Sequence, residues 1–341
     1  MKKSLSILFA LLFIFCQILS GCGNQTTTPT SKSGFYFNTI ITVTIYQDVD
    51  EDTMDECFAL ARKYENLFSN TIPESDISRI NAANGTPVAV DDETIALLEK
   101  GIAYGELSEG KFDITIGKLS DLWDISTKAL LEETDASMIP VKEDIASALA
   151  TIDYHNIRIE RNEVTLLDPN TKLDLGGIAK GYIADRMKAF LNEKGFTNGF
   201  INLGGNFLAL GPKENGDAYT VGIQKPFAED GSAIASIEVT DETVVSSGIY
   251  ERYFTVDDTL YHHILDTSTG YPYRNNLLGV TIITENSVDG DALSTTCFSL
   301  GLEDGMALIE SLPDTEAVFI TDDYELHTSS GIGTTIPFTK R

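Results

Sequence analysis

The chain is short of basic residues, cysteine and histidine, and these shortages exclude several classes of protein. Its 341 residues include 24 Lys and Arg against 52 Asp and Glu, which gives a formal net charge of −28. A surface of this sign repels phosphate backbones, so we expect no nucleic-acid partner. With four Cys, four His and no C-x-x-C or H-E-x-x-H pattern, we expect no structural zinc site either.

The chain also lacks an apolar run long enough to cross a bilayer. The longest run, Leu5 to Leu19, has about 15 residues where a span needs ~20. Lys2 and Lys3 before this run, and Leu19-Ser20-Gly21-Cys22 after it, are similar to a bacterial lipoprotein signal. A plain secretory peptide and an N-terminal anchor are the alternatives. The 42% of hydrophobic residues indicate a globular protein with a buried core.

The expected domain order follows from this signal. Residues 1–21 form the signal peptide, and Cys22 is the lipidated first residue of the mature chain. Residues 22–34 are polar and form a flexible tether, and residues 35–341 form the folded domain. We therefore expect a cell-membrane protein that is lipid-anchored on the extracytoplasmic face.

Hydrophobic periodicity predicts a layered α+β domain with a mixed β-sheet and flanking helices. Strands are expected at 35–46, in a hairpin at 157–166, through most of 199–284 and at 316–321. Helices are expected at 57–68, 91–102, 141–149, 179–191, 291–300 and 304–312. Cys57 and Cys297 fall on predicted buried helix faces, where free thiols are favoured over a disulfide.

One stretch combines glycines with a lysine where a strand gives way to a helix. In Lys172 to Gly181, Gly176 and Gly177 allow close backbone approach, and the helix start that follows offers free N–H groups to an anion. Lys180 could neutralise a phosphate. The spacing matches neither a P-loop nor the G-x-G-x-x-G fingerprint, so a tight strand-to-helix turn is an equal alternative.

Other polar stretches allow two interpretations each. Asp113 could bind a sugar hydroxyl or an adenine edge, or cap a helix. His262 or His263 could be a general base or contact a phosphate; a structural role is the alternative. Asp291 and Thr295 are four residues apart and share a helix face, which suits Mg²⁺, although an N-cap Asp with a buried Thr is the commoner arrangement. For Ile201 to Asn206 we favour a structural role.

Together and in this order, the stretches resemble the FAD:protein FMN transferase (ApbE) family, from Phe35 to about Ser311. The matching segments are Phe37 to Thr39, Ser69 to Asn81, Phe112 to Gly117, Asp174 to Gly181, Ile201 to Asn206, His263 to Asp266 with Thr269 to Pro272, and Asp291 to Thr295.

The resemblance implies an enzyme that binds FAD and Mg²⁺, moves FMN onto a Thr or Ser hydroxyl of a target flavoprotein and releases AMP. It places the metal on the side chains of Asp291 and Thr295 and the carbonyl of Gly177. It makes His263 and Asp291 the candidate catalytic residues. The implied FAD contacts are Phe37, Thr71, Lys111, Phe112, Asp113, Asp174, Lys180 and Leu265.

The chain departs from the family pattern at three places. Thr267 replaces a frequent Pro, and Ser294 stands where some relatives have an acid. The variable loop at Phe37-Asn38 is a candidate determinant of transfer against FAD hydrolysis. An FAD pyrophosphatase and a lipid-anchored flavin-binding protein without catalysis are therefore kept as alternatives. The acceptor pattern that the family modifies is absent, so we do not expect self-flavinylation.

Overall fold

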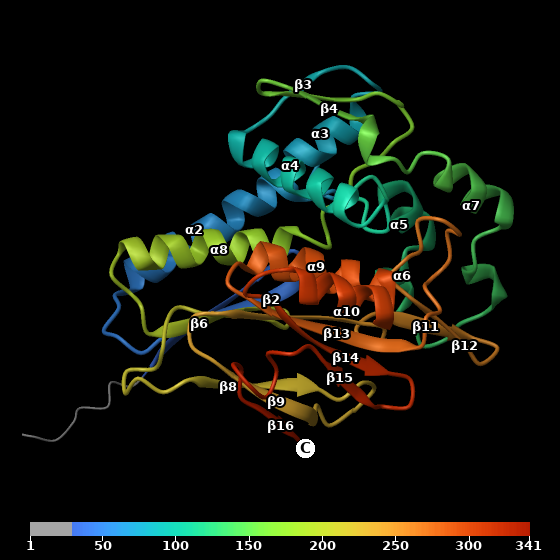
Figure 1. The fold of residues 1–341 in the computed structure, drawn as a ribbon. Coiled ribbons are helices and arrows are strands. Elements are labelled where there is room, and N and C mark those ends of the chain that lie inside the picture. Colours follow the sequence, from blue (N-terminus) through green and yellow to red (C-terminus); the bar gives the residue numbers. More distant parts are fainter. Residues whose placement is uncertain (1–28) are drawn as a thin grey trace, which may run out of the picture.

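An eight-stranded antiparallel sheet separates a layer of helices from a smaller sheet (Figure 1). The computed structural model describes residues 29–341. In order across the large sheet, the strands are β1 (Thr30–Tyr36), β2 (Thr39–Ile45), β6 (Gly199–Leu203), β7 (Asn206–Ala209), β10 (Thr243–Gly248), β13 (Leu277–Thr284), β14 (Glu316–Thr321) and β15 (Leu326–Thr328).

The expected layered α+β architecture is confirmed, but the expected mixed sheet is wrong. Every neighbouring pair in the large sheet is antiparallel. The tight hairpins β1–β2 and β6–β7 force antiparallel pairing, since parallel neighbours need crossovers of a dozen or more residues. Neighbours with long connections, such as β13 and β14 on either side of α9 and α10, are antiparallel as well.

Helices cover one face of this sheet, as Figure 1 shows. They are α2 (Glu51–Phe68), α8 (Ala179–Glu193), α9 (Ser287–Leu300) and α10 (Leu302–Ser311). α4 (Asp92–Leu107) packs against α9 on the side away from the sheet. The stripe Met54, Cys57, Ala61, Tyr64 and Phe68 is buried, as the helical spacing predicts. These side chains share one core cluster with the inward residues of β2. Cys57 and Cys297 are buried and free, as expected.

A second sheet packs on the other face and consists of β8 (Tyr219–Gln224), β9 (Ala233–Val239) and β16 (Phe338–Lys340). The remaining elements lie around the helical layer. They are α3 (Asp76–Ala82), β3 (Val88–Ala89), α5 (Gly117–Trp123), α6 (Ile125–Lys128), α7 (Lys142–Leu149), the 3-10 helices Ala136–Met138 and Tyr154–Asn156, β4 (Ile157–Glu160), β5 (Glu163–Leu166), β11 (Tyr253–Val256) and β12 (Thr259–His262).

The start of the folded body differs from the expectation at two points. Residues 35–46 are a hairpin rather than one strand, because Phe37 and Asn38 turn the chain with φ of 51° and 55°. The last five residues of the expected tether 22–34 belong to β1, which begins at Thr30. Polar Ser31 and Ser33 suit this exposed edge strand, where they hydrogen-bond to Thr44 and Thr42 across the pair.

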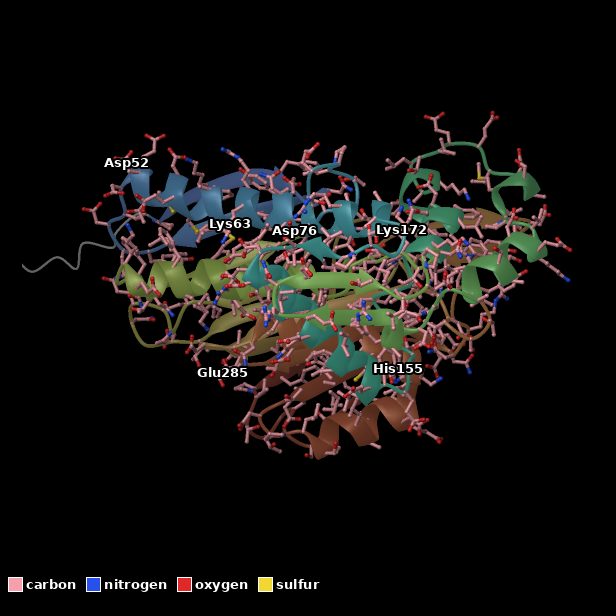
Figure 2. The ribbon with its side chains drawn as sticks, turned by 90° about the horizontal axis from the view of Figure 1, so that it is seen from above. Asp52, Lys63, Asp76, His155, Lys172 and Glu285 are labelled. Atoms are coloured by element: carbon pink, nitrogen blue, oxygen red, sulfur yellow. The ribbon has the colours of Figure 1, made fainter. Side chains whose placement is uncertain are left out.

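The expected signal peptide and the lipidation site Cys22 lie outside the described residues. Within residues 29–341, no helix combines the length and the apolar character needed to cross a bilayer. Acidic side chains such as Asp52 and Glu285 are exposed toward the outline of the molecule (Figure 2), in keeping with the net charge of −28.

Candidate active site

The glycine turn and helix α9 meet, although Gly177 and Thr295 are 118 positions apart in sequence. A Cβ atom on Gly177 would lie 3.6 Å from the Thr295 hydroxyl oxygen and 3.2 Å from the Phe112 ring. At Gly181 the two helices are closer still, since a Cβ there would lie 2.1 Å from the Ser287 carbonyl oxygen. Only glycine permits this approach of α8 to α9.

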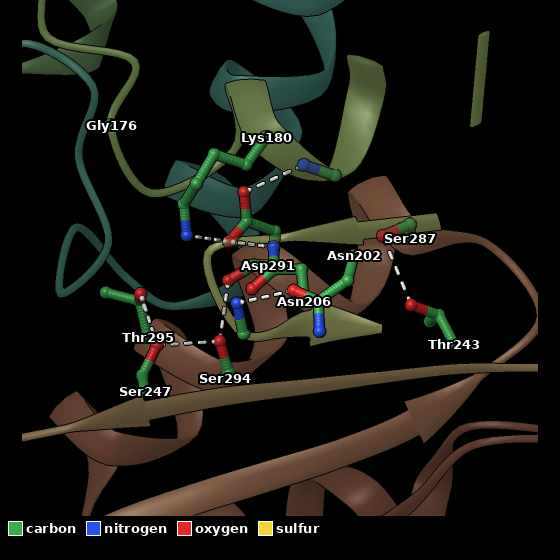
Figure 3. A network of polar contacts seen from close by, with 12 residues as sticks. Gly176, Lys180, Asn202, Asn206, Thr243, Ser247, Ser287, Asp291, Ser294 and Thr295 are labelled. Carbon is green, nitrogen blue, oxygen red and sulfur yellow. Dashed lines mark hydrogen bonds and ion pairs between the residues drawn. The ribbon is translucent and has the colours of Figure 1, made fainter. Parts of the chain in front are cut away.

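Three donors hold the buried carboxylate of Asp291 (Figure 3). The Gly181 N–H donates to Oδ2 at 3.0 Å. Oδ1 accepts from the Asn206 side-chain amide at 3.1 Å and from the Lys180 ammonium at 3.3 Å. Both oxygens of this carboxylate are therefore hydrogen-bonded, and groups from α8 and β7 fix its direction.

Three hydroxyls form a hydrogen-bonded row beside Asp291, and one of them, that of Thr295, lies near the glycine turn. Ser294 donates to the Asp291 carbonyl at 2.9 Å, and Ser247 of β10 lies 2.8 Å from the Ser294 oxygen. The Ser247 oxygen is also 3.3 Å from that of Thr295. The commoner interpretation of this pair, an N-cap Asp, is wrong: Asp291 lies inside α9, which begins at Ser287.

His263 lies just past β12 and is half-buried. Its Nδ1 lies 3.3 Å from the Arg252 carbonyl oxygen. Because a carbonyl only accepts, this bond places the proton on Nδ1 and leaves a lone pair on Nε2. Burial, and then the charge of Arg252, lower the pKa of His263 to about 3, and Lys180 also contributes to the shift. The imidazole is neutral at pH 7, as a general base must be.

His262 faces the other way. It is 3% exposed, its Nε2 lies 2.9 Å from the Tyr273 carbonyl oxygen, and its Nδ1 accepts from the Ile264 N–H. Burial lowers the pKa of His262 to about 4. Of the two histidines, His262 is therefore a satisfied structural residue.

The segments expected to contact FAD run beside the glycine turn. The backbone N–H of Asp174 donates to the Ile114 carbonyl at 2.8 Å, and that of Gly117 donates to the Lys172 carbonyl at 2.9 Å. Asn81 clamps the same segment, donating to the Leu173 carbonyl and accepting from its N–H. The Asp174 carboxylate accepts from the Gly176 N–H at 2.8 Å, which shapes the turn.

Asp113 uses its carboxylate within the protein. One oxygen accepts from the N–H and the hydroxyl of Thr115, and the other accepts from the Tyr154 N–H. Burial raises the pKa of Asp113, with these hydrogen bonds opposing the shift. The helix cap that the sequence offered as the alternative is not found, because the N-cap of α5 is Ile116 and makes no side-chain cap bond. Asp113 instead closes a local turn at Thr115 and binds the distant Tyr154 N–H. The neighbouring ring of Phe112 is also buried and lies edge-on to Tyr104.

The other residues expected to contact FAD range from buried to exposed. Thr267 donates to the Gly110 carbonyl at 2.8 Å and so ties the chain after buried Leu265 to the segment that carries Lys111. Lys111 itself is exposed. Phe37 is half-buried, and its N–H donates to Glu65 at 2.8 Å. Thr71 is exposed and hydrogen-bonds locally to Ser69.

Sequence reasoning missed three residues of this site. Asn206 and Ser247 approach from strands, and neither carries a local pattern beyond the glycines at 204–205. Glu251 follows β10. Glu251 as a whole is exposed, but desolvation around its carboxyl raises the pKa of that group, Lys180 and Arg252 oppose the shift, and Asp291 adds to it. Glu251 therefore lies within electrostatic range of the same lysine and carboxylate.

The donor set suits a hard cation with few protein ligands. It offers the Asp291 carboxylate, the Thr295 hydroxyl and the backbone at Gly177, all of them oxygen donors, with Ser247 in contact with Thr295 behind them. In the described part of the chain, no group of three or more His, Cys, Asp and Glu side chains could hold a metal ion. Mg²⁺ fits such a site, since it takes one or two carboxylates and completes its shell with water and phosphate.

Comparison with known proteins gives the same assignment as the sequence motifs. The model of the ApbE family matches residues 37–319. FAD:protein FMN transferase of Klebsiella pneumoniae (strain 342) is 36% identical, with 82% of this chain and 86% of the relative covered. The protein of the same name from Treponema pallidum (strain Nichols) is 32% identical, over 94% of this chain and 92% of its own.

Solved structures agree. The ApbE protein of Thermotoga maritima MSB8 superposes with a TM-score of 0.79 at 30% identity, covering 89% of this chain and 97% of that one. The flavin transferase ApbE of Vibrio cholerae gives a TM-score of 0.77 at 26% identity, with 89% and 97% covered. The resemblance drawn from the motifs is confirmed, and the chain belongs to the ApbE family.

Proposed function

We propose that this chain is an FAD:protein FMN transferase, which moves the FMN part of FAD onto a Ser or Thr hydroxyl of a target flavoprotein and releases AMP. The relatives at 36% and 32% identity bear that name. The observation that carries the proposal is the convergence of the Gly177 turn, Lys180 and the Asp291–Thr295 pair, because this chemistry needs local positive charge for a pyrophosphate within an acidic protein.

The site residues have distinct roles in this proposal. Asp291, Thr295 and the Gly177 carbonyl would hold Mg²⁺, which when bound would offset the charge of the pyrophosphate. Lys180, which hydrogen-bonds to Asp291, would contact a phosphate oxygen. The free Nε2 of His263 accepts the proton of the acceptor hydroxyl.

The reaction then balances without an added oxidant or reductant. The acceptor oxygen forms a bond to the phosphorus of the FMN moiety. The bond from that phosphorus to the bridging oxygen breaks, and AMP leaves with this oxygen. Water competes with the acceptor hydroxyl for the same phosphorus, so the balance between transfer and hydrolysis depends on how well an acceptor excludes water.

One assay separates the possible activities. The purified protein is incubated with FAD, Mg²⁺ and an acceptor domain. Covalent flavin on the acceptor with release of AMP is the expected result. Release of AMP and free FMN in the presence of the acceptor would make the chain a pyrophosphatase, and intact FAD would make it a flavin-binding protein.

A pair of variants on one helix tests the site itself. Asp291→Ala should abolish Mg²⁺-dependent release of AMP. Asp289→Asn is the matched control. Asp289 lies two residues before Asp291 on α9, but Tyr104 and Lys100 bind its carboxylate. We expect it to retain activity. Unchanged AMP release in Asp291→Ala would remove the proposed metal site.

We also propose that the protein is anchored to the cell membrane through a lipid on Cys22 and acts on the extracytoplasmic face. The proposal rests on the charged start, the apolar run and the Leu19-Ser20-Gly21-Cys22 sequence. Its target flavoprotein would then be reached on that side of the membrane.

A further inference from the structure

Ser247 contributes a hydroxyl to the proposed metal site from a strand rather than from α9. Thr243, Val245 and Ser247 share the face of β10 that packs on α9, since a Cβ on Gly290 would touch the side chains of Thr243 and Val245. Ser246 points to the opposite face, where its hydroxyl lies 2.8 Å from that of Thr281.

The hydrogen-bond partners of Ser294, Ser247 and Thr295 determine which way each hydroxyl proton points (Figure 3). Ser294 donates its only hydroxyl proton to the Asp291 carbonyl, which can only accept. The Ser294 oxygen must therefore accept at its 2.8 Å contact, so Ser247 donates to it. With its proton committed, Ser247 can only accept at the 3.3 Å contact, so the donor there is Thr295.

These proton directions determine which side of the Thr295 hydroxyl oxygen is available to a cation. Its proton points at Ser247, toward the sheet, and its lone pairs point away from that bond. The Gly177 turn lies beside the same oxygen, since a Cβ atom built on Gly177 would be 3.6 Å from it. An oxygen with its proton directed away is a better ligand for a cation than a freely rotating hydroxyl.

We infer that Ser247 is a positioning residue: it takes the hydroxyl proton of Thr295 and thereby presents the Thr295 lone pairs to a divalent cation. The inference rests on the proposed function, because it assumes that Thr295 is a metal ligand. It assigns to β10 a part in the site that the Asp291–Thr295 pair alone does not require.

The test measures binding of Mn²⁺, used as a spectroscopic probe for Mg²⁺, by the change in its electron paramagnetic resonance signal. Loss of an outer partner of a metal ligand usually weakens binding about 10- to 100-fold. Ser247→Ala should therefore bind Mn²⁺ at least about tenfold more weakly than the wild type. Ser247→Thr, which keeps the hydroxyl, should recover most of the affinity.

Two further variants keep the result independent of folding defects. Ser246→Ala removes the same group from the next residue of β10 on the other face and should bind Mn²⁺ like the wild type. Ser294→Ala frees the Ser247 proton to turn toward Thr295, so it should weaken Mn²⁺ binding too. Near-ultraviolet circular dichroism checks that each variant is folded.

The outcomes separate this inference from the proposed function. If Asp291→Ala loses Mn²⁺ while folded Ser247→Ala or Ser294→Ala binds it as the wild type does, the role of Ser247 is overturned and the metal site stands. Weakening by Ser246→Ala equal to that by Ser247→Ala would also overturn it. If the wild type itself binds no Mn²⁺ in the presence of FAD, the metal site of the proposed function fails.

Discussion

His263 shows how a backbone carbonyl can prepare a side chain for proton transfer. The Arg252 carbonyl holds the Nδ1 proton, so the ring has one defined tautomer and one free lone pair. Burial and the positive charges of Arg252 and Lys180 keep the proton off that lone pair, with the pKa lowered to about 3. A base that remains neutral over the working range does not limit the rate at mildly acidic pH.

For this residue we predict that kcat/KM hardly changes as the pH falls into the mildly acidic range. An unshifted histidine, with a pKa near 6.5, would halve kcat/KM at that pH, whereas His263 stays unprotonated until the pH approaches about 3. The kcat/KM for FMN transfer should therefore change little between pH 8 and pH 5, because kcat/KM reports the groups of the free enzyme. A limb with a midpoint near 6.5 that vanishes in His263→Ala would contradict the low pKa.

A second residue-scale prediction concerns the role of His263. His263→Ala should slow transfer by about 10²- to 10⁴-fold, the usual contribution of a general base. Its affinity for FAD, measured by fluorescence quenching, should change far less. His262→Gln is the matched control, because His262 faces the Tyr273 carbonyl and should affect stability more than rate. Equal losses of affinity and rate in His263→Ala would make it a binding residue.

What could be predicted for single residues depended on whether their partners are local. The spacing of Asp291 and Thr295 is a property of one helix, and the sequence shows it. Both oxygens of Asp113 are satisfied by Thr115 and Tyr154, and the second of these contacts depends on a distant turn. Asn206 reaches Asp291 only because β7 and α9 pack together, which no local pattern encodes.

At the scale of elements, periodicity predicted the long helices well and turns less well. The helix at 57–68 and that at 179–191 carry clear apolar stripes, and both are found within α2 and α8. The β1–β2 hairpin was missed because its turn residues, Phe37 and Asn38, both have positive φ. Asn-Gly and Asp-Gly are the usual signals of such a turn, and a Phe gives none.

Helix α9 begins with an unusual cap, supplied by another helix. Its N-cap residue, Asn286, makes no side-chain cap bond. Asp185 of α8 accepts instead from the N–H groups of Ser287 and Val288, each at 2.8 Å. The two helices that form the site are thus joined at this point as well as at Gly181.

The cap predicts a dependence of stability on pH. Burial is the main reason why the pKa of Asp185 rises from 3.8 to about 6. A pKa raised on folding favours the folded state below 3.8, and this contribution is lost as the pH rises through 6. The free energy of unfolding of the wild type, relative to Asp185→Asn, should fall by on the order of 2–3 kcal/mol between pH 4 and pH 7.5.

Urea unfolding at the two pH values measures this difference. Asp185→Ala is the companion variant: it leaves both N–H groups of α9 without their acceptor and should cost about 1–2 kcal/mol at either pH, relative to Asp185→Asn. A gap between wild type and Asp185→Asn that does not change with pH would mean that the carboxyl titrates normally.

At the scale of the whole molecule, the strand order of the large sheet determines which distant segments of the chain become neighbours. The order β1-β2-β6-β7-β10-β13-β14-β15 places β6 between β2 and β7, and β7 next to β10. The Gly204 N–H donates to the Ile40 carbonyl beside the Phe37-Asn38 turn. The variable loop of the family therefore lies next to the turn that precedes Asn206, a neighbourhood that the sequence alone does not give.

The position of β1 also sets how far the folded body could lie from a lipid on Cys22. β1 begins at Thr30, so only residues 23–29 connect it to that cysteine. At about 3.3–3.6 Å per residue, they reach at most about 25 Å. The anchored domain would therefore be held close to the bilayer, closer than a tether ending at residue 34 would allow.

The anchor itself is testable by fractionation of cells that express the full chain. We expect the wild type in the membrane fraction, with radioactive palmitate incorporated, and Cys22→Ser in the soluble or uncleaved form without label. Cys57→Ala is the control, since the Cys57 thiol is fully buried and should be irrelevant to lipidation. Cys22→Ser that still takes up palmitate would exclude Cys22 as the anchor, and wild type without label would return the N-terminus to a plain secretory peptide or an N-terminal anchor.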